Sequence, residues 1–167
     1  WKGLKDLYAI GFIDRLPRLV SAQAAGCCPL NRAIETGEDW HPMEENTLAD
    51  SIAVGVPRNA DKALMAIRES NGLVVNVSDE EIMAAQKLLG RTCGVFGEPA
   101  GVTGAAGLKK LCGEGKIPAD ATVVSVVTGN GLKDVANAIA ACGEPISIPG
   151  DMDRLLRAFE ENGIVVE

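Results

Sequence analysis

Two glycine-containing turns hold the residues whose types and spacing could support chemistry. The turn Thr128–Gly131 has the sequence Thr-Gly-Asn-Gly; it follows the apolar run 122–127 and leads at once into a helical pattern. The turn Glu98–Gly101 has the sequence Glu-Pro-Ala-Gly and follows the shorter apolar run 93–96. Ligands of open α/β sheets bind at the carboxyl ends of the strands. We therefore expect the Thr128 hydroxyl and the Glu98 carboxylate to face one crevice.

Each turn also has a simpler interpretation. Thr128–Gly131 is compatible with a plain tight connection between a strand and a helix, and a glutamate before a proline is by default a turn residue that points to solvent. The glycines allow positive φ and a close approach of a ligand, and the amides at the helix start could hold an anion. The spacing matches neither the dinucleotide-binding fingerprint nor the phosphate-binding loop with its lysine.

No other part of the chain offers a recognisable catalytic group. His41 is the only histidine and lies in the polar segment 36–46 between Trp40 and Pro42, where we expect a solvated or packed side chain rather than a general base. The five cysteines are odd in number and form no Cys-x-x-Cys pair, which favours buried, reduced thiols in a cytosolic protein over disulfides or a metal site.

The composition limits the class of protein further. With 47% hydrophobic but only 4% aromatic residues, the 167-residue chain is expected to build one core from Ala, Val, Leu and Ile. A net charge of -7 argues against nucleic acid or an anionic membrane as the main partner. The sequence contains no apolar run long enough to cross a membrane and no signal-peptide pattern.

Strand and helix patterns alternate along the chain, which predicts an α/β fold with an open, mainly parallel sheet and helices on both faces. A capping box, formed by Ser78 and Glu81, predicts the start of one helix, and Gly11 and Gly90 predict the ends of two others. The expected strands are 19–25, 73–77, 93–96 and 122–127, with extended pieces at 144–148 and 164–166. The expected helices are 4–10, 28–34, 59–69, 79–89, 102–112, 132–141 and 152–161.

Four segments carry a resemblance to threonine synthase, and the resemblance extends over nearly the whole chain. Thr128–Asp134 is similar to that family's Thr-Gly-x-Gly-Leu-Lys-Asp motif, and Glu98–Gly101 to its Glu-Pro-Ala-Gly turn. Thr47–Pro57 resembles the family segment before a proline-started helix, and Trp1–Leu7 resembles the helix that follows its central glycine-rich strand. The Thr128 motif is fairly specific, whereas related dehydratases share the Glu98 turn.

The resemblance implies a fold-type II pyridoxal-phosphate enzyme, a carbon–oxygen lyase that converts O-phosphohomoserine and water to threonine and phosphate. It implies that the Thr128 hydroxyl meets the pyridine nitrogen of pyridoxal 5'-phosphate, as a neutral donor to an unprotonated nitrogen, and that the turn glycines give the ring room. It also implies a cytoplasmic protein and a possible homodimer. The expected cofactor-binding residues are Thr128, Gly129, Asn130, Gly131 and Glu98.

Two family features are absent from this sequence. The Schiff-base lysine of the family lies in a Ser-Phe-Lys-Asp segment and its phosphate cradle in a glycine- and asparagine-rich loop; neither occurs here, and both are expected upstream. We therefore expect residues 1–167 to be the C-terminal part of the large cofactor-binding domain, without the small domain, and to be inactive alone. The alternatives are part of a threonine or serine dehydratase-like lyase, against which the Leu-Lys-Asp continuation argues, and a non-catalytic α/β binding domain.

Overall fold

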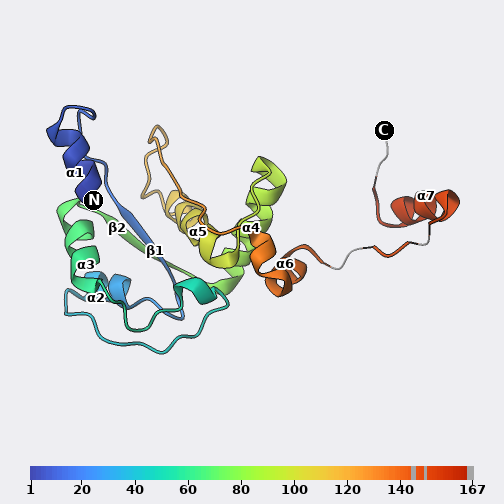
Figure 1. Ribbon diagram of the computed structural model, residues 1–167, viewed down its shortest axis with the longest axis horizontal. Helices are drawn as coiled ribbons and strands as arrows, with labels where there is room; N and C mark the ends of the chain where they lie inside the picture. The colour runs from blue at the N-terminus through green and yellow to red at the C-terminus, as the bar shows by residue number, and fades with distance from the viewer. Residues whose placement is uncertain (144–145, 149, 165–167) are drawn as a thin grey trace.

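The fold was described from a computed structural model, which defines residues 1–143, 146–148 and 150–164. Figure 1 shows two strands with helices on either side, followed by a C-terminal stretch that leads away from them. In chain order the elements are α1 (Lys2–Ala9), β1 (Val20–Ala24), α2 (Pro29–Thr36), the 3-10 turn η1 (Asp50–Ile52), α3 (Ala60–Glu69), β2 (Leu73–Val77), α4 (Asp79–Cys93), α5 (Pro99–Gly113), the 3-10 turn η2 (Gly131–Lys133), α6 (Val135–Cys142) and α7 (Met152–Glu161).

The two strands form a parallel pair, as a chain with alternating strands and helices requires. Val20 lies opposite Leu73 at one end of the pair, and Ala24 lies opposite Val77 at the other. The chain between β1 and β2 passes through α2, η1 and α3, so the pair is a βαβ unit. The predicted boundaries of both strands are confirmed to within one residue.

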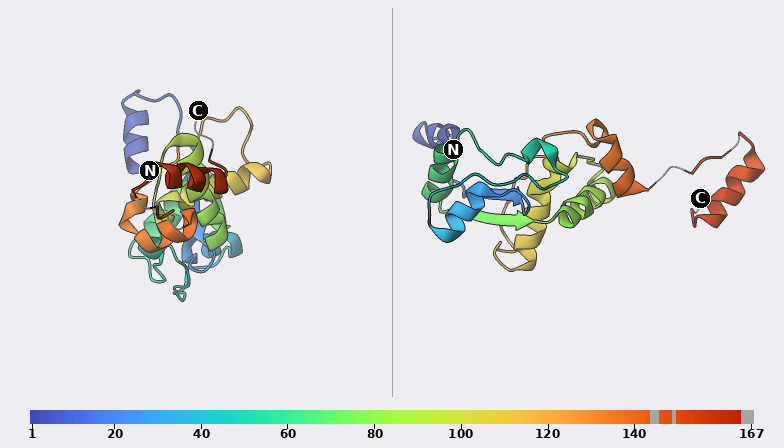
Figure 2. Two further views of the ribbon diagram at one scale, coloured as in Figure 1. Left: turned by 90° about the vertical axis from the view of Figure 1, so that its right-hand side faces the viewer. Right: turned by 90° about the horizontal axis from the view of Figure 1, so that it is seen from below.

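Helices cover both faces of this pair, as predicted (Figures 1 and 2). On one face, the buried Asn31 of α2 donates from its side-chain amide to the carbonyl oxygen of Val75, at 2.9 Å, and to Oδ1 of Asn76, at 2.8 Å. On the other face, α5 packs so closely that a Cβ added to Gly107 would lie 2.7 Å from the side chain of Val75 and 2.9 Å from that of Ala22. The glycine therefore sets the distance between α5 and the strands.

The hydrophobic core lies between the strands, α4 and α5. It is built from small and branched aliphatic side chains, in agreement with the low aromatic content: Ala24, Ala49, Val75, Val77, Ile82, Ala85, Val102, Ala106 and Leu111. The predicted capping box fixes the start of α4, because Ser78 Oγ accepts from the Glu81 amide at 3.2 Å and the Glu81 carboxylate accepts from the Ser78 amide at 2.8 Å.

Two predicted strands are wrong. The segment 93–96 is not a strand, because α4 continues through Gly90 to Cys93 and ends at Gly94, whose φ of 66° is the left-handed conformation of a helix end. The segment 122–127 is extended, but its backbone makes no hydrogen bond to any described residue. Val124 is 86% exposed there and Val126 is 71% exposed. Strand formation needs a neighbour, and none of the described residues pairs with this segment.

The C-terminal region also differs in detail from the prediction. Helix α6 begins after η2 rather than directly at the turn, and it buries Ala138 and Ala141 while the predicted apolar residue Ile139 is 45% exposed. Helix α7 has the predicted bounds, but it buries no residue and lies apart from the other elements (Figure 2). Of the predicted extended pieces, residues 144–145 and 165–166 lie outside the described residues, and 146–148 form no strand.

Candidate functional site

The two turns singled out in the sequence lie against each other. The Gly131 amide donates to the carbonyl oxygen of Phe96, and the Glu98 amide donates to that of Gly129, each at 2.9 Å. These bonds surround an isolated antiparallel bridge between Gly97 and Asn130. The structure thus brings together the residues predicted to share a site, although through a bridge between the turns rather than through paired parallel strands.

The turn glycines are required by close packing, not by unusual backbone angles. Neither Gly129 nor Gly131 has a positive φ, so the expected use of that conformation is wrong. A Cβ at Gly129 would collide with the Glu98 carboxylate, and a Cβ at Gly131 would collide with the Phe96 ring. The space beside each glycine is therefore already filled by a protein side chain.

Glu98 is buried, which contradicts its default interpretation as a solvent-facing turn residue. It is 7% exposed and occupies the N-cap position of α5, yet its side chain accepts no capping hydrogen bond. Its carboxylate lies 3.4 Å from the ammonium group of Lys133, whose side chain is 65% exposed. A carboxylate at a helix N-terminus is also stabilised by the helix dipole. The site thus contains one nearly buried negative charge with a cation at its rim.

Thr128 and Asn130 have different roles within their turn. The Thr128 side chain is exposed, and its hydroxyl makes no hydrogen bond within the described part of the chain. The Asn130 side chain is engaged locally, because its Oδ1 accepts from the Leu132 amide at 2.9 Å and so starts η2. Thr128 therefore has a hydroxyl free to bind a ligand, whereas Asn130 shapes the turn.

Three contributors to the site were missed from the sequence: Phe96, Lys133 and Gln86. Gln86 on α4 is fully buried and donates from Nε2 to the carbonyl oxygen of Gly97 at 2.8 Å; its Oε1 has no partner among the described residues. Its spacing of four residues from the buried Ile82 was the available signal, since positions i and i+4 share one helix face. It anchors the Glu98 turn to α4.

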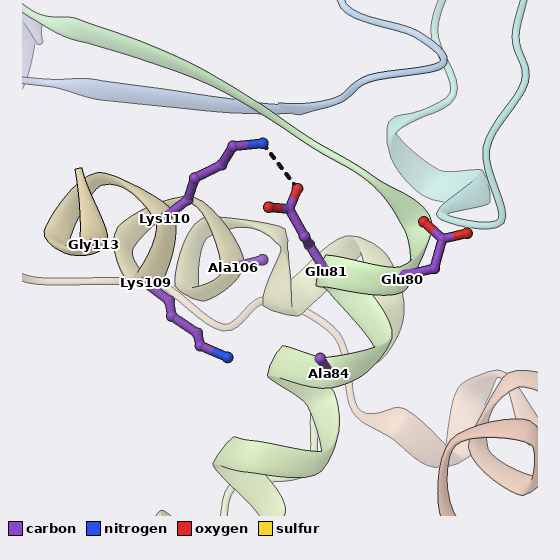
Figure 3. A pocket seen from close by; sticks show the side chains of 7 residues that line it. All are labelled: Glu80, Glu81, Ala84, Ala106, Lys109, Lys110 and Gly113. Atoms are coloured by element: carbon purple, nitrogen blue, oxygen red, sulfur yellow. Dashed lines mark hydrogen bonds and ion pairs between the residues drawn. The ribbon is translucent and has the colours of Figure 1, made fainter.

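A shallow cavity of about 310 Å³ lies between α4 and α5, outside the two turns (Figure 3). Lys110 donates there to the Glu81 carboxylate at 3.0 Å and to the carbonyl oxygen of Asn76 at 2.9 Å. Burial raises the pKa of Glu81, but the Ser78 amide and the Lys110 ammonium outweigh it and hold that pKa below its ordinary value. These charges are satisfied within the protein, so they stabilise the contact between the two helices.

The remaining candidates show no catalytic arrangement. His41 borders a cavity of about 170 Å³ next to Trp40, whose indole donates to Asp61 at 3.3 Å. All five cysteines are free, but the prediction that they are buried is wrong for Cys93, Cys112 and Cys142, which are exposed. Burial raises the pKa of the Cys27 and Cys28 thiols, which keeps them protonated. Within residues 1–143, 146–148 and 150–164, no group of three His, Cys, Asp or Glu side chains could hold a metal ion. The same residues form no helix long and apolar enough to span a bilayer.

Comparison with known proteins identifies the family of this chain. Residues 1–129 match the family described as pyridoxal-phosphate dependent enzyme. The chain belongs to this family. It is 44% identical over 161 residues to threonine synthase of Methanosarcina acetivorans, covering 95% of this chain and 40% of that protein. It is 46% identical over 163 residues to threonine synthase of Methanocaldococcus jannaschii, covering 96% of this chain and 40% of that protein.

The fold of the family is supported independently by solved structures. Maize serine racemase superposes with a TM-score of 0.57 at 19% identity, over 93% of this chain and 41% of that chain. Serine racemase from Dictyostelium discoideum gives a TM-score of 0.52 at 19% identity, over 77% of this chain and 38% of that chain. The chain is therefore a threonine synthase-like, fold-type II domain of the pyridoxal-phosphate dependent enzymes. It spans about 40% of the length of the curated relatives it matches.

Proposed function

We propose that this chain is the C-terminal part of the large domain of a threonine synthase. The complete enzyme converts O-phosphohomoserine and water to threonine and phosphate in the cytoplasm. The observation that carries the proposal is the identity of 44–46% to threonine synthases along nearly the whole chain. That likeness includes the motif Thr128–Asp134, which in this structure lies against the Glu98 turn.

The residues of the two turns suit the pyridine end of pyridoxal 5'-phosphate. Thr128 supplies a hydroxyl that is exposed and free of other hydrogen bonds among the described residues, so it can donate to an unprotonated ring nitrogen. The cofactor, when bound, supplies an electron-withdrawing ring that stabilises negative charge on the substrate carbon. A hydroxyl partner leaves that ring a weaker electron acceptor than a carboxylate partner would, which suits controlled elimination and replacement.

Some residues of the site are fixed by contacts within the protein, whereas the Thr128 hydroxyl is available to bind a ligand. Gly129 and Gly131 allow the Glu98 carboxylate and the Phe96 ring to approach the turn backbone, and Asn130 fixes the turn itself. These contacts hold Thr128 in place before a ligand arrives, and such preorganisation reduces the cost of binding. The lysine that bonds the cofactor belongs to another part of the enzyme, so the 167-residue chain is inactive alone.

An assay of the natural gene product that contains this chain tests the proposal. With pyridoxal 5'-phosphate and O-phosphohomoserine, it should release phosphate and form threonine in equal amounts. The 167-residue chain alone, under the same conditions, serves as the control and should give no turnover. Release of ammonia from threonine without consumption of O-phosphohomoserine would identify a dehydratase instead. No absorbance change on addition of the cofactor would identify a non-catalytic binding domain.

A further inference from the structure

The environment of the Glu98 carboxylate contains a second charged residue that the proposed function does not use. The Glu98 side chain is 9% exposed, and its only ion pair within the described residues is with Lys133, at 3.4 Å. Transfer of a carboxylate out of water is costly unless a cation or hydrogen-bond donors compensate for it. The helix dipole at the α5 N-terminus provides part of this compensation. The ammonium group of Lys133, which is carried on a largely exposed side chain, provides the other part.

Lys133 is held at the rim of the site by the same turn that carries Thr128. It is the last residue of η2, and its amide donates to the carbonyl oxygen of Asn130 at 3.1 Å. The amide of Gly131, the first residue of η2, donates a hydrogen bond to the carbonyl oxygen of Phe96, which lies beside the Glu98 turn. The backbone of Lys133 is thereby fixed relative to both turns, and its side chain reaches from one turn to the buried charge of the other.

We propose that Lys133 is a positioning residue that holds the Glu98 carboxylate against Gly129, next to Thr128. This inference rests on the proposed function, because it assigns a role within the same cofactor site. A charge fixed at that place gives a ligand bound at Thr128 a constant electrostatic environment. Without Lys133, the carboxylate loses its ion-pair partner and is free to leave its position against Gly129, which changes the electrostatic environment of a ligand bound at Thr128.

The experiment is a double-mutant cycle on the natural gene product with Lys133→Met, Glu98→Gln and the double variant. Cofactor affinity is measured by absorbance titration with pyridoxal 5'-phosphate, together with kcat and KM for O-phosphohomoserine. Lys133→Met should weaken cofactor affinity by about tenfold, within the range for directly interacting groups. The double variant should bind the cofactor no more weakly than Glu98→Gln alone. Lys133→Arg should restore most of the affinity, because it retains the charge.

Lys116→Met is the matched control. Lys116 also forms an ion pair through a largely exposed side chain, with Glu114 at 2.8 Å, but outside the two turns. Lys116→Met should leave cofactor affinity, kcat and KM unchanged. The inference is overturned if Lys133→Met leaves cofactor affinity as unchanged as Lys116→Met does. It is also overturned if the fold-losses of affinity caused by Lys133→Met and Glu98→Gln multiply in the double variant. A wild-type protein that binds cofactor but does not turn over O-phosphohomoserine would refute the proposed function, while the affinity cycle would still test Lys133.

Discussion

Strand β2 and the segment 122–127 have nearly the same composition but different structures. Both are runs of valine with one or two polar residues. In β2, Val75 is 5% exposed and Val77 is fully buried, whereas in the segment Val124 is 86% exposed and Val126 is 71% exposed. The difference lies in the neighbours. β2 pairs with β1 and is covered by helices, whereas the segment has no hydrogen-bonded neighbour among the described residues and meets α5 at Ser125 and the chain at Gly97 through Val127.

Helix α5 contacts both regions, which makes the comparison direct. Gly107 faces the paired strands, at Ala22 and Val75, and Gly104 faces the segment, at Ser125. The helix therefore packs against a rigid sheet at one place and against an unpaired extended chain at another. A preference for strand conformation depends on such packing partners, so the same kind of sequence gives a strand in one place only.

The largest effect is expected from placing a charge in each region. Val77→Asp should cost on the order of 4 kcal/mol in the free energy of unfolding, because it buries an unpaired carboxylate. Val124→Asp should change it by less than about 0.5 kcal/mol in the 167-residue chain. Urea denaturation measures both. In the natural gene product, Val124→Asp should become costly if another part of the protein pairs with the segment. Equal losses for the two variants in the short chain would remove the distinction.

A second pair of variants compares the two contacts of α5. Gly107→Ala should destabilise the protein by about 1 kcal/mol, because crowding against Val75 and Ala22 outweighs the gain in helix propensity. Gly104→Ala should be neutral or stabilise by about 0.5 kcal/mol, since the added methyl meets only the Ser125 hydroxyl, at 3.2 Å. Thermal unfolding measures the difference. A loss at Gly104 as large as that at Gly107 would mean that the segment is packed as firmly as the sheet.

A third comparison concerns helix caps inside and outside the packed region. Ser78 Oγ and Asp151 Oδ1 accept from backbone amides at 3.2 Å and 3.0 Å. Ser78→Ala should cost about 1 kcal/mol, because α4 is part of the core. Asp151→Ala should leave global unfolding unchanged, because α7 buries no residue, and should only accelerate amide exchange within α7. A lower global stability of the Asp151 variant would show that α7 is packed in solution.

The smallest expected effect is a dependence of stability on pH through Glu81. Its pKa is lowered in the folded protein, so its stabilising contribution is present above the unfolded pKa and is lost as the pH falls through the folded pKa. Glu81→Gln should therefore reduce the loss of stability below about pH 4.5, by less than about 1 kcal/mol because the side chain is 39% exposed. Denaturation curves at several pH values measure this. Parallel pH profiles for both proteins would contradict it.

The sequence predicted those features that depend on local chemistry and burial pattern. The strands 19–25 and 73–77, the capping box at Ser78, and the association of the Thr128 and Glu98 turns were all recognisable. The prediction of a strand at 93–96 was wrong because α4 ends at Gly94 and not, as expected, at Gly90. The prediction of a strand at 122–127 was wrong because strand pairing depends on neighbours that a local pattern does not specify.

Within the site, the sequence predicted which turns matter but not how they pack. The burial of Glu98 and its ion pair with Lys133 arise from contacts between segments about thirty residues apart, for which no periodicity exists. Gln86 was recognisable from helical spacing, since it shares the buried face of Ile82. The cofactor was inferred from the family resemblance, which the comparisons confirm. Residue types and spacing alone indicated only a ligand site, and they attributed the turn glycines to positive φ rather than to close packing.

The proposed cofactor site depends most on the hydroxyl of Thr128 as the contact to the cofactor. The most direct test is the affinity of the natural gene product for pyridoxal 5'-phosphate, measured by absorbance titration for wild type, Thr128→Val and Thr128→Ser. Thr128→Val keeps the shape but removes the hydroxyl, so affinity should fall by about tenfold, as for loss of one hydrogen bond. Thr128→Ser should stay close to wild type. Equal affinity of all three proteins would contradict the assignment of this site.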